Sequence, residues 1–138
     1  MIQYKESIPV NENDIKALYE DVKWTAYTND MPKLVNAIKN SLAVITAWSD
    51  NTLVGLIRVV GDGLTIIYIQ DILVLENYQN QGIGSELMRR ILSKYKNVRQ
   101  KVLLTNDEPK VRAFYEKHDF SSCDKGELVS FVKIDTKL

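Results

Sequence analysis

The first forty residues carry apolar side chains at the three- and four-residue spacing that is typical of helices. After a short strand near residues 2–5, this spacing predicts one helix over residues 15–22 and a second over residues 34–38. Each helix is preceded by polar residues whose side chains can accept hydrogen bonds from its first N–H groups. The expected capping residues are Asn11, Asn13 and Asp30.

The pattern then changes to short runs rich in Val, Ile and Leu. Residues 42–48 and 52–60 are separated by a few polar residues and predict a hairpin. A glycine-rich turn at residues 61–63 leads into a third, longer strand over residues 64–75. Because short turns join the three strands, we expect them to be antiparallel neighbours.

Helical spacing returns at Ile83, and a short apolar strand at residues 102–105 follows. Asp107 and Pro109 are expected to begin another helix, because proline is tolerated in a first turn. Two strands, at residues 121–123 and 128–134, are expected to close the chain.

This order of elements, β-α-α-β-β-β-α-β-α-β-β, predicts an α+β fold with a mixed, mostly antiparallel central sheet and helices on both faces. No repeat or linker interrupts the pattern, so we expect a single domain over residues 1–138.

Charge and cysteine content narrow the classes of protein that fit. Lys and Arg number 18, Asp and Glu also number 18, and no basic block occurs, which argues against a nucleic-acid partner. Cys123 is the only cysteine, so an intrachain disulfide is excluded and a reducing compartment is indicated. The apolar runs are too short to span a bilayer, and the start has no secretory pattern. We therefore expect a cytoplasmic protein without a membrane partner.

The clearest chemical signal is the turn Gln79-Asn80-Gln81-Gly82-Ile83-Gly84 between a strand and a helix. Two glycines let the backbone turn sharply, and the free N–H groups of the helix start favour an anion such as a diphosphate. The two glutamine amides and the Ser85 hydroxyl add uncharged donors. Glycines at such a junction also occur in plain tight connections, which is the competing interpretation.

Two common phosphate-binding motifs are excluded. No lysine followed by Ser or Thr comes after the glycines, so the turn is not a P-loop. Leu87 occupies the position where a dinucleotide fingerprint requires a third glycine or an alanine.

The pattern Gln79-x-x-Gly82-x-Gly84, after the strand that contains residues 69–75, resembles motif A of the GCN5-related N-acetyltransferases (the GNAT family). Residues 112–120 also resemble that family's motif B, with Phe114 and Tyr115 in the place of its Phe-Tyr pair. The resemblance covers essentially the whole chain. It implies the GNAT fold, acetyl-CoA as co-substrate and transfer of an acetyl group to an amine.

The resemblance also implies a donor site. The arm of CoA would lie beside the motif A strand, bound by backbone groups, and backbone N–H groups of the turn would bind the pyrophosphate. The residues expected to bind CoA are Leu73, Val74, Gln79, Gln81, Gly82, Ile83, Gly84 and Ser85. With one histidine in the chain, His118, no metal is expected.

Acyl transfer requires a proton for the departing thiolate and a neutral amine. Tyr115 matches the tyrosine that the family uses as general acid; the competing interpretation is a core aromatic. Asp71 interrupts an apolar strand, which indicates either a substrate or proton-relay role or a structural carboxylate satisfied by Arg58. Strand pleating predicts that Asp71 and Gln70 face opposite sides, so only one of them can face the substrate.

The acceptor amine is expected beside the loop between the first two helices, where Trp24 and Tyr27 could form an apolar wall or a cation–π contact. Trp24 could equally pack the helix onto the sheet. Gln70 is a further candidate for hydrogen bonding to the acceptor.

Two positions depart from the family pattern. Glu108 stands where the family often has an asparagine that contacts CoA, which leaves a role for the nearby Asn106 open. Asp119 replaces the glycine of a Gly-Phe pair, and aspartate tolerates a left-handed turn better than most residues.

The sequence thus predicts an acyl-CoA-dependent N-acetyltransferase that acts by direct attack of a primary amine, carried by a small molecule or a peptide. The alternatives are a non-catalytic acyl-CoA-binding sensor or scaffold and, more remotely, a nucleotide-phosphate binder of another fold. Whether the chain forms a homodimer is left open.

Overall fold

The computed structural model describes residues 1–9 and 11–135 of the chain. It divides into two compact units, Met1–Leu104 and Thr105–Leu138. No helix in these described residues is long and apolar enough to cross a membrane.

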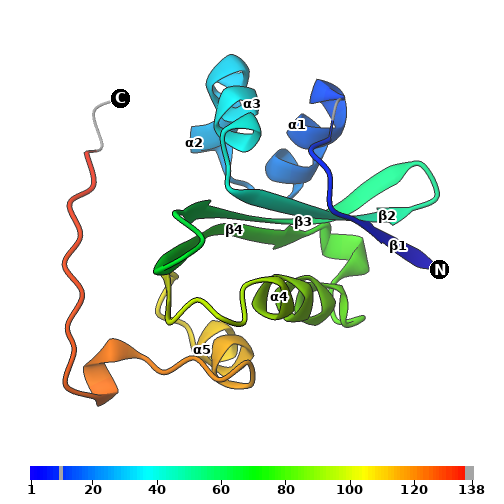
Figure 1. The fold of residues 1–138 in the computed structure, drawn as a ribbon. Helices are drawn as coiled ribbons and strands as arrows, with labels where there is room; N and C mark the ends of the chain where they lie inside the picture. Colours follow the sequence, from blue (N-terminus) through cyan, green and yellow to red (C-terminus); the bar gives the residue numbers. More distant parts are fainter. Residues whose placement is uncertain (10, 136–138) are drawn as a thin grey trace. The chain divides into compact units, whose positions relative to one another are not determined.

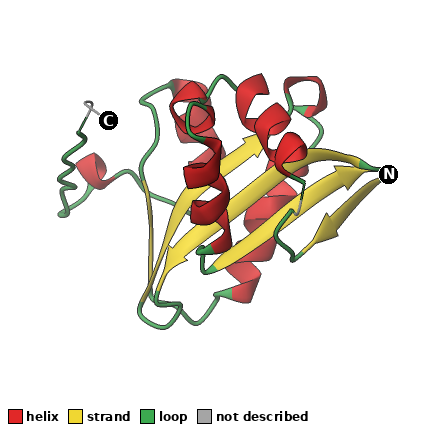
Figure 2. Cartoon of the chain, turned by 90° about the horizontal axis from the view of Figure 1, so that it is seen from above, coloured by secondary structure: helices red, strands yellow, loops and turns green. Residues whose placement is uncertain are grey.

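The first unit is built on a five-stranded sheet with the order β1-β2-β3-β4-β5. The first four strands are antiparallel neighbours, and β5 runs parallel to β4 (Figure 2). This arrangement confirms the predicted mixed, mostly antiparallel sheet. The strands are β1 (Ile2–Lys5), β2 (Ala43–Ser49), β3 (Thr52–Gly61), β4 (Ile66–Val74) and β5 (Gln100–Leu103).

Helices cover both faces of this sheet, as predicted. Three helices, α1, α2 and α3, lie on one side, and α4 lies on the other (Figure 1). The short helix α2 occupies what was expected to be a loop. Their bounds are α1 (Glu12–Asp21), α2 (Thr25–Thr28), α3 (Met31–Lys39) and α4 (Ile83–Lys94), with a 3-10 turn η1 (Glu76–Tyr78) before α4.

Side-chain caps fix where the first helices begin. The Asn11 carboxamide oxygen accepts a hydrogen bond from the Asn13 N–H at 2.8 Å, and Asp30 accepts one from the Lys33 N–H at 3.2 Å. Asn13 itself lies inside α1, so only one of the two expected asparagines is the cap.

One apolar core fills the space between the sheet and helices α1 and α3. Its residues come from the apolar faces of α1 and α3 and from the strand residues that these helices cover. They are Ile15, Leu18, Tyr19, Leu34, Ile38, Val44, Leu53, Leu56 and Leu73.

The second unit contains helix α5 (Pro109–Glu116) and a 3-10 turn, η2 (Cys123–Lys125). Pro109 is in the first turn as expected, but Asp107 does not cap the helix. Its carboxylate instead pairs with Arg112, with Nε and Oδ1 2.6 Å apart. Asp119 has φ +68°, the left-handed conformation anticipated at that position.

The two strands predicted at residues 121–123 and 128–134 are wrong. Part of the first lies in η2, and residues 127–135 form neither helix nor strand. A β-strand is stabilised by the strand that pairs with it, and in the described residues nothing pairs with this segment.

Candidate functional site

Helix α4 begins at a glycine cap that leaves its first amides open. Gly82 has φ +85° and makes no side-chain cap, and the first helical hydrogen bond runs from the Glu86 N–H to the Gly82 carbonyl at 3.0 Å. The N–H groups of Ile83 and Gly84 therefore have no carbonyl one turn earlier in the helix. A Cβ atom at Gly82 would meet nothing within 4 Å. Such a helix start suits an anion.

The glutamine side chains of the turn contact carbonyl groups of the protein. The Gln79 carboxamide donates to the Val74 carbonyl at 3.0 Å, and that of Gln81 lies 3.5 Å from the Asn77 carbonyl. Gln79 thus ties the turn to the end of β4. The expectation that both amides bind the pyrophosphate stays a prediction.

The second half of β4 has an open edge. Strand β5 pairs with β4 only from Ile66 to Ile69, and among the described residues no strand continues the ladder beside residues 70–74. On the other edge, the Leu75 N–H donates to the Val54 carbonyl at 2.8 Å.

In an antiparallel ladder, the backbone N–H and C=O groups of successive residues point alternately to the two sides of the strand. Because Leu75 bonds to β3, the backbone groups of Leu73 also point toward β3, and those of Ile72 and Val74 point toward the open edge. Ile72 was not among the residues predicted to bind the donor. Only the register of the sheet reveals it, because Ile72, Leu73 and Val74 are all apolar and the sequence does not distinguish among them.

A β-bulge in β4 changes the expected orientation of its polar residues. Arg58 pairs with Asp71 and Val59 pairs with Ile69, so Gln70 is an extra residue in the ladder. As a result, Gln70 and Asp71 both contact Tyr27, and the expectation that they face opposite sides is wrong.

Asp71 is the centre of a buried polar cluster. Its carboxylate accepts hydrogen bonds from Arg58 Nε at 2.5 Å, from the Tyr19 hydroxyl at 2.9 Å and from the Tyr27 hydroxyl at 2.9 Å. The side chain of Asp71 is 2% exposed and that of Arg58 is 6% exposed. Burial acts to lower the pKa of Arg58, but the neighbouring Asp71 outweighs it and the pKa is raised. The cluster is thus an internal ion pair that two tyrosines complete.

The two tyrosines that bind this carboxylate pack against each other and against Trp24. Tyr19 makes edge contacts with Trp24 at 6.0 Å and with Tyr27 at 5.4 Å between ring centroids, and Trp24 and Tyr27 are 6.2 Å apart. Burial, followed by the charge of Asp71, raises the pKa of both Tyr19 and Tyr27, so both phenols stay protonated and can donate. Tyr19 lies within the helix that the apolar spacing predicted over residues 15–22, and that spacing gave no sign of a partner for its hydroxyl.

Gln70 extends the cluster outward. Its carboxamide donates to the Tyr27 hydroxyl at 2.9 Å, and its own side chain is exposed. A chain of hydrogen bonds therefore runs from the buried carboxylate through Tyr27 to a carboxamide on the surface.

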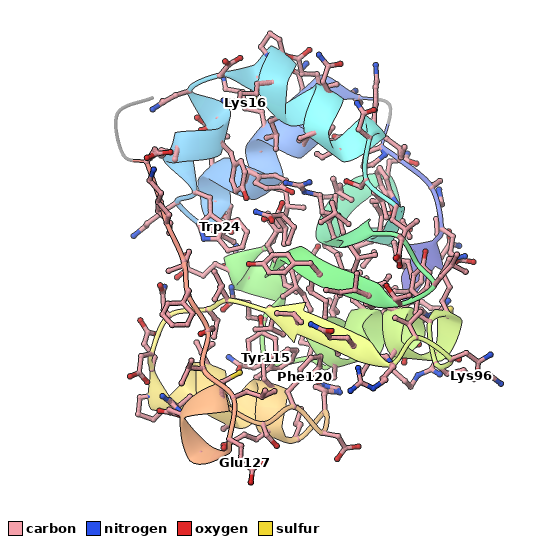
Figure 3. All side chains as sticks on the ribbon, turned by 60° about the vertical axis from the view of Figure 1, so that its left-hand side comes forward. Lys16, Trp24, Lys96, Tyr115, Phe120 and Glu127 are labelled. Carbon is pink, nitrogen blue, oxygen red and sulfur yellow. The ribbon has the colours of Figure 1, made fainter. Side chains whose placement is uncertain are left out.

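Tyr115 lies in the second unit, on α5. Its ring makes edge contacts with Phe114 at 5.2 Å and Phe120 at 6.0 Å, and Figure 3 shows Tyr115 and Phe120 close together. Burial raises the pKa of Tyr115, and a hydrogen bond with Thr105 only partly opposes this. The phenol is therefore neutral at physiological pH and can act as a proton donor.

An open helix start after β4 and an open β4 edge are features that can bind a long phosphorylated carrier. Residues 40–122 match the family model described as the acetyltransferase (GNAT) domain. The chain belongs to the GNAT acetyltransferase family.

Individual relatives agree with this assignment. A solved GNAT family acetyltransferase from Streptococcus pneumoniae TIGR4 is 34% identical, with a TM-score of 0.87 over 99% of this chain and 100% of that one. A protein of Prochlorococcus marinus, described as an uncharacterized N-acetyltransferase ycf52-like, is 25% identical over 86% of this chain and 67% of its own length.

A more distant structure shares the fold alone. The aminoglycoside N-acetyltransferase AAC(6')-Iy in complex with CoA is 14% identical, with a TM-score of 0.71 over 97% of this chain and 95% of that chain.

Proposed function

We propose that this chain transfers an acetyl group from acetyl-CoA to a primary amine by direct attack within a ternary complex. The observation that carries the proposal is the pairing of an uncapped α4 start with an open β4 edge in a member of the GNAT family. The first feature suits a pyrophosphate, and the second suits an extended chain with amide groups.

The donor site uses backbone more than side chains. The amides of the turn, from Gln81 to Ser85, would bind the pyrophosphate, and the backbone beside the open edge would bind the pantetheine arm. Geometry favours Val74 over Leu73 for this role and adds Ile72, because only alternate residues face the open edge. Gln79 would support this site through the hydrogen bond that it donates to the Val74 carbonyl at the end of β4.

In the reaction, the neutral amine nitrogen attacks the thioester carbonyl carbon and releases a proton to water. The C–S bond then breaks, and its electron pair goes to sulfur. A backbone N–H at the open edge, that of Val74 for example, would stabilise the oxyanion. Tyr115 would give its proton to the departing thiolate, whose conjugate thiol has a pKa of about 8.5. The raised pKa of Tyr115 keeps that proton available.

Asp71 would act on the acceptor side through Tyr27. Since Arg58 and two tyrosine hydroxyls already surround its carboxylate, it would serve as a positioning residue or as the inner end of a proton relay. The amine itself would meet Gln70, Tyr27 and Trp24, which together offer a carboxamide and aromatic surface.

Release of the CoA thiol in the presence of a panel of amines tests the proposal. Tyr115→Phe should lower kcat at least tenfold and leave the Kd of acetyl-CoA unchanged, while Tyr95→Phe, at the end of α4, should change neither. Because the Tyr115 pKa lies above its ordinary value of 10.0, wild-type kcat should show no decline below about pH 10.

The outcomes separate the alternatives. Acetyl-CoA binding without amine-dependent turnover would favour the non-catalytic acyl-CoA-binding sensor or scaffold. Stabilisation by ATP but not by CoA would favour a nucleotide-phosphate binder.

We also propose that residues 1–138 form a single acetyltransferase domain, since the family match runs through both compact units. A cytoplasmic location, and activity without a metal, nucleic acid or membrane, stay predictions from composition and sequence.

A further inference from the structure

The hydrogen bonds of the Asp71 cluster have a fixed direction. An ionised carboxylate only accepts, so the hydroxyls of Tyr19 and Tyr27 both donate to Asp71, each over 2.9 Å. The oxygen of Tyr27 can then only accept from Gln70, which donates to it through Nε2 at 2.9 Å. The chain of hydrogen bonds therefore ends on the carbonyl oxygen of Gln70, an uncharged acceptor on an exposed side chain.

Both carboxylate oxygens of Asp71 are engaged inside the protein. Oδ1 accepts from Tyr27, and Oδ2 accepts from Tyr19 and from Arg58 Nε. A proton passed inward through Tyr27 would neutralise this carboxylate. It would leave the guanidinium of Arg58, whose side chain is 6% exposed, without its counter-charge. The ion pair therefore opposes the use of Asp71 as a base.

The neighbouring elements bring two phenols and a guanidinium to Asp71. They are Tyr19 of α1, Tyr27 of α2 and Arg58 of β3. Burial, followed by the charge of Asp71, raises the pKa of both phenols, so that neither readily gives up its proton. Arg58 also donates through Nη1 to the hydroxyl of Ser41 at 3.3 Å. Each titratable member of this cluster is thus held in one protonation state.

We infer that this cluster positions the acceptor nitrogen without removing a proton from it, and that the enzyme therefore prefers the α-amines of amino acids or peptides to alkylamines such as the lysine side chain. The inference rests on the proposed function. The nitrogen would donate one N–H to the Gln70 carbonyl oxygen, with its substituent against the rings of Trp24 and Tyr27. Its lone pair then stays available for the thioester carbon. An ammonium group has no such lone pair, so the amine must arrive as the free base.

The two classes of amine differ in how often they occur as the free base. An α-amine has a pKa of about 8 and the lysine side chain one of about 10.4, so at about pH 7.5 roughly one α-amine in four is neutral, against roughly one side-chain amine in a thousand. The side-chain nitrogen is the stronger nucleophile once neutral, which offsets part of this difference. We therefore expect kcat/KM to favour the α-amine about tenfold or more.

Two isomers of acetylated lysine amide test this preference on one skeleton. The free amine is the α-amine in Nε-acetyl-lysine amide and the side-chain amine in Nα-acetyl-lysine amide, and both yield the same diacetylated product. With wild-type enzyme and saturating acetyl-CoA, release of the CoA thiol at about pH 7.5 should give the first isomer a kcat/KM about tenfold or more higher.

The outcomes of this comparison separate the inference from the proposed function. Equal values for the two isomers, or a preference for the side-chain amine, would overturn the inference and leave the acetyltransferase activity established. Turnover of other amines but of neither isomer would also contradict it. No turnover with any amine would overturn the proposed function itself, and the inference with it.

The pH dependence shows what takes the proton. If the amine reacts as the free base that it forms in water, kcat/KM levels off at the pKa of the amine, near about pH 8 for the α-amine isomer, and still rises at about pH 9.5 for the other. If Asp71 or Tyr27 removed the proton, that group would set the profile and both isomers would level off at the same pH. This second result would refute the inference.

Tyr27→Phe breaks the link between Asp71 and Gln70 and keeps the aromatic ring. Positioning predicts a several-fold higher KM for the α-amine isomer, because Gln70 loses the hydroxyl that fixes its carboxamide, with no change in the pH at which kcat/KM levels off. A fall in kcat of about tenfold or more with a shifted pH profile would instead show a proton relay and contradict the inference. Tyr95→Phe, at the end of α4, is the control and should alter none of these values. The two measurements on wild-type enzyme do not depend on the folding of this variant.

Discussion

The buried carboxylate of Asp71 joins a charge in the protein interior to a polar group on the surface. Arg58 neutralises it, Tyr19 anchors it to α1, and Tyr27 leads from it to the surface carboxamide of Gln70. The sequence predicted a costly buried charge and suggested Arg58 as its partner. It could not show that two tyrosines from a distant segment complete the site, because helix packing alone brings them there.

Removal of this carboxylate should strongly destabilise the protein. Asp71→Ala leaves the buried guanidinium of Arg58 without a counter-charge, and breaking a buried pair in this way costs about 3–5 kcal/mol. Glu20→Ala removes an exposed carboxylate from α1 and should change the free energy of unfolding by less than about 0.5 kcal/mol. Urea denaturation measures both values. Equal stability of the two variants would mean that the ion pair is not important to the fold.

Gly82 offers a second test at the residue scale. At φ +85° an alanine is strained by about 1 kcal/mol even though its Cβ meets no atom, so Gly82→Ala should lower stability slightly and raise the KM for acetyl-CoA several-fold. Gly126→Ala is the control, because φ there is −131° and the space is also open. Steady-state kinetics with acetyl-CoA varied would show the difference, and equal KM values would exclude the turn from donor binding.

At the scale of elements, the sequence predicted those structures whose cause is local. Helical spacing located α1, α3 and α4, side-chain caps marked the starts of α1 and α3, and polar turns located β2, β3 and β4. The bulge at Gln70 was not predictable, since it arises from the register between β3 and β4. The final strands were predicted wrongly for a related reason: residues 128–134 have the composition of a strand, but a strand also requires a partner.

Close contact between β3 and α4 links sheet packing to the proposed donor site. A Cβ atom at Gly55 would lie 3.3 Å from side-chain carbons of both Ile83 and Leu87, so the larger side chain of Gly55→Val would press on the first turns of α4. Overpacking of this kind costs about 1–3 kcal/mol. We expect a lower Tm and a raised KM for acetyl-CoA, with a smaller change in the KM for the amine.

Thr52→Val, at an exposed position of the same strand, should change neither constant and serves as the control. If Gly55→Val raised the KM for the amine and spared that for acetyl-CoA, the position of α4 would matter for the acceptor instead.

At the scale of the whole molecule, the proposed donor site and the proposed general acid lie in different compact units. The open edge of β4, the start of α4 and the Asp71 cluster all belong to Met1–Leu104, and Tyr115 belongs to the unit that follows. A chain that ends after Leu104 keeps every described strand and the apolar core. Donor binding and turnover should therefore be separable.

We expect this shortened chain to retain its circular dichroism spectrum of mixed helix and strand and to bind acetyl-CoA, measured by calorimetry, while amine-dependent release of the CoA thiol disappears. Full-length Tyr115→Phe is the matched control, because it removes only the phenol hydroxyl and keeps all other parts. If the folded short chain still turned over, Tyr115 would have no part in the chemistry. If it folded but did not bind acetyl-CoA, residues after Leu104 would contribute to the donor site, and the open β4 edge with the α4 start would not suffice to hold CoA.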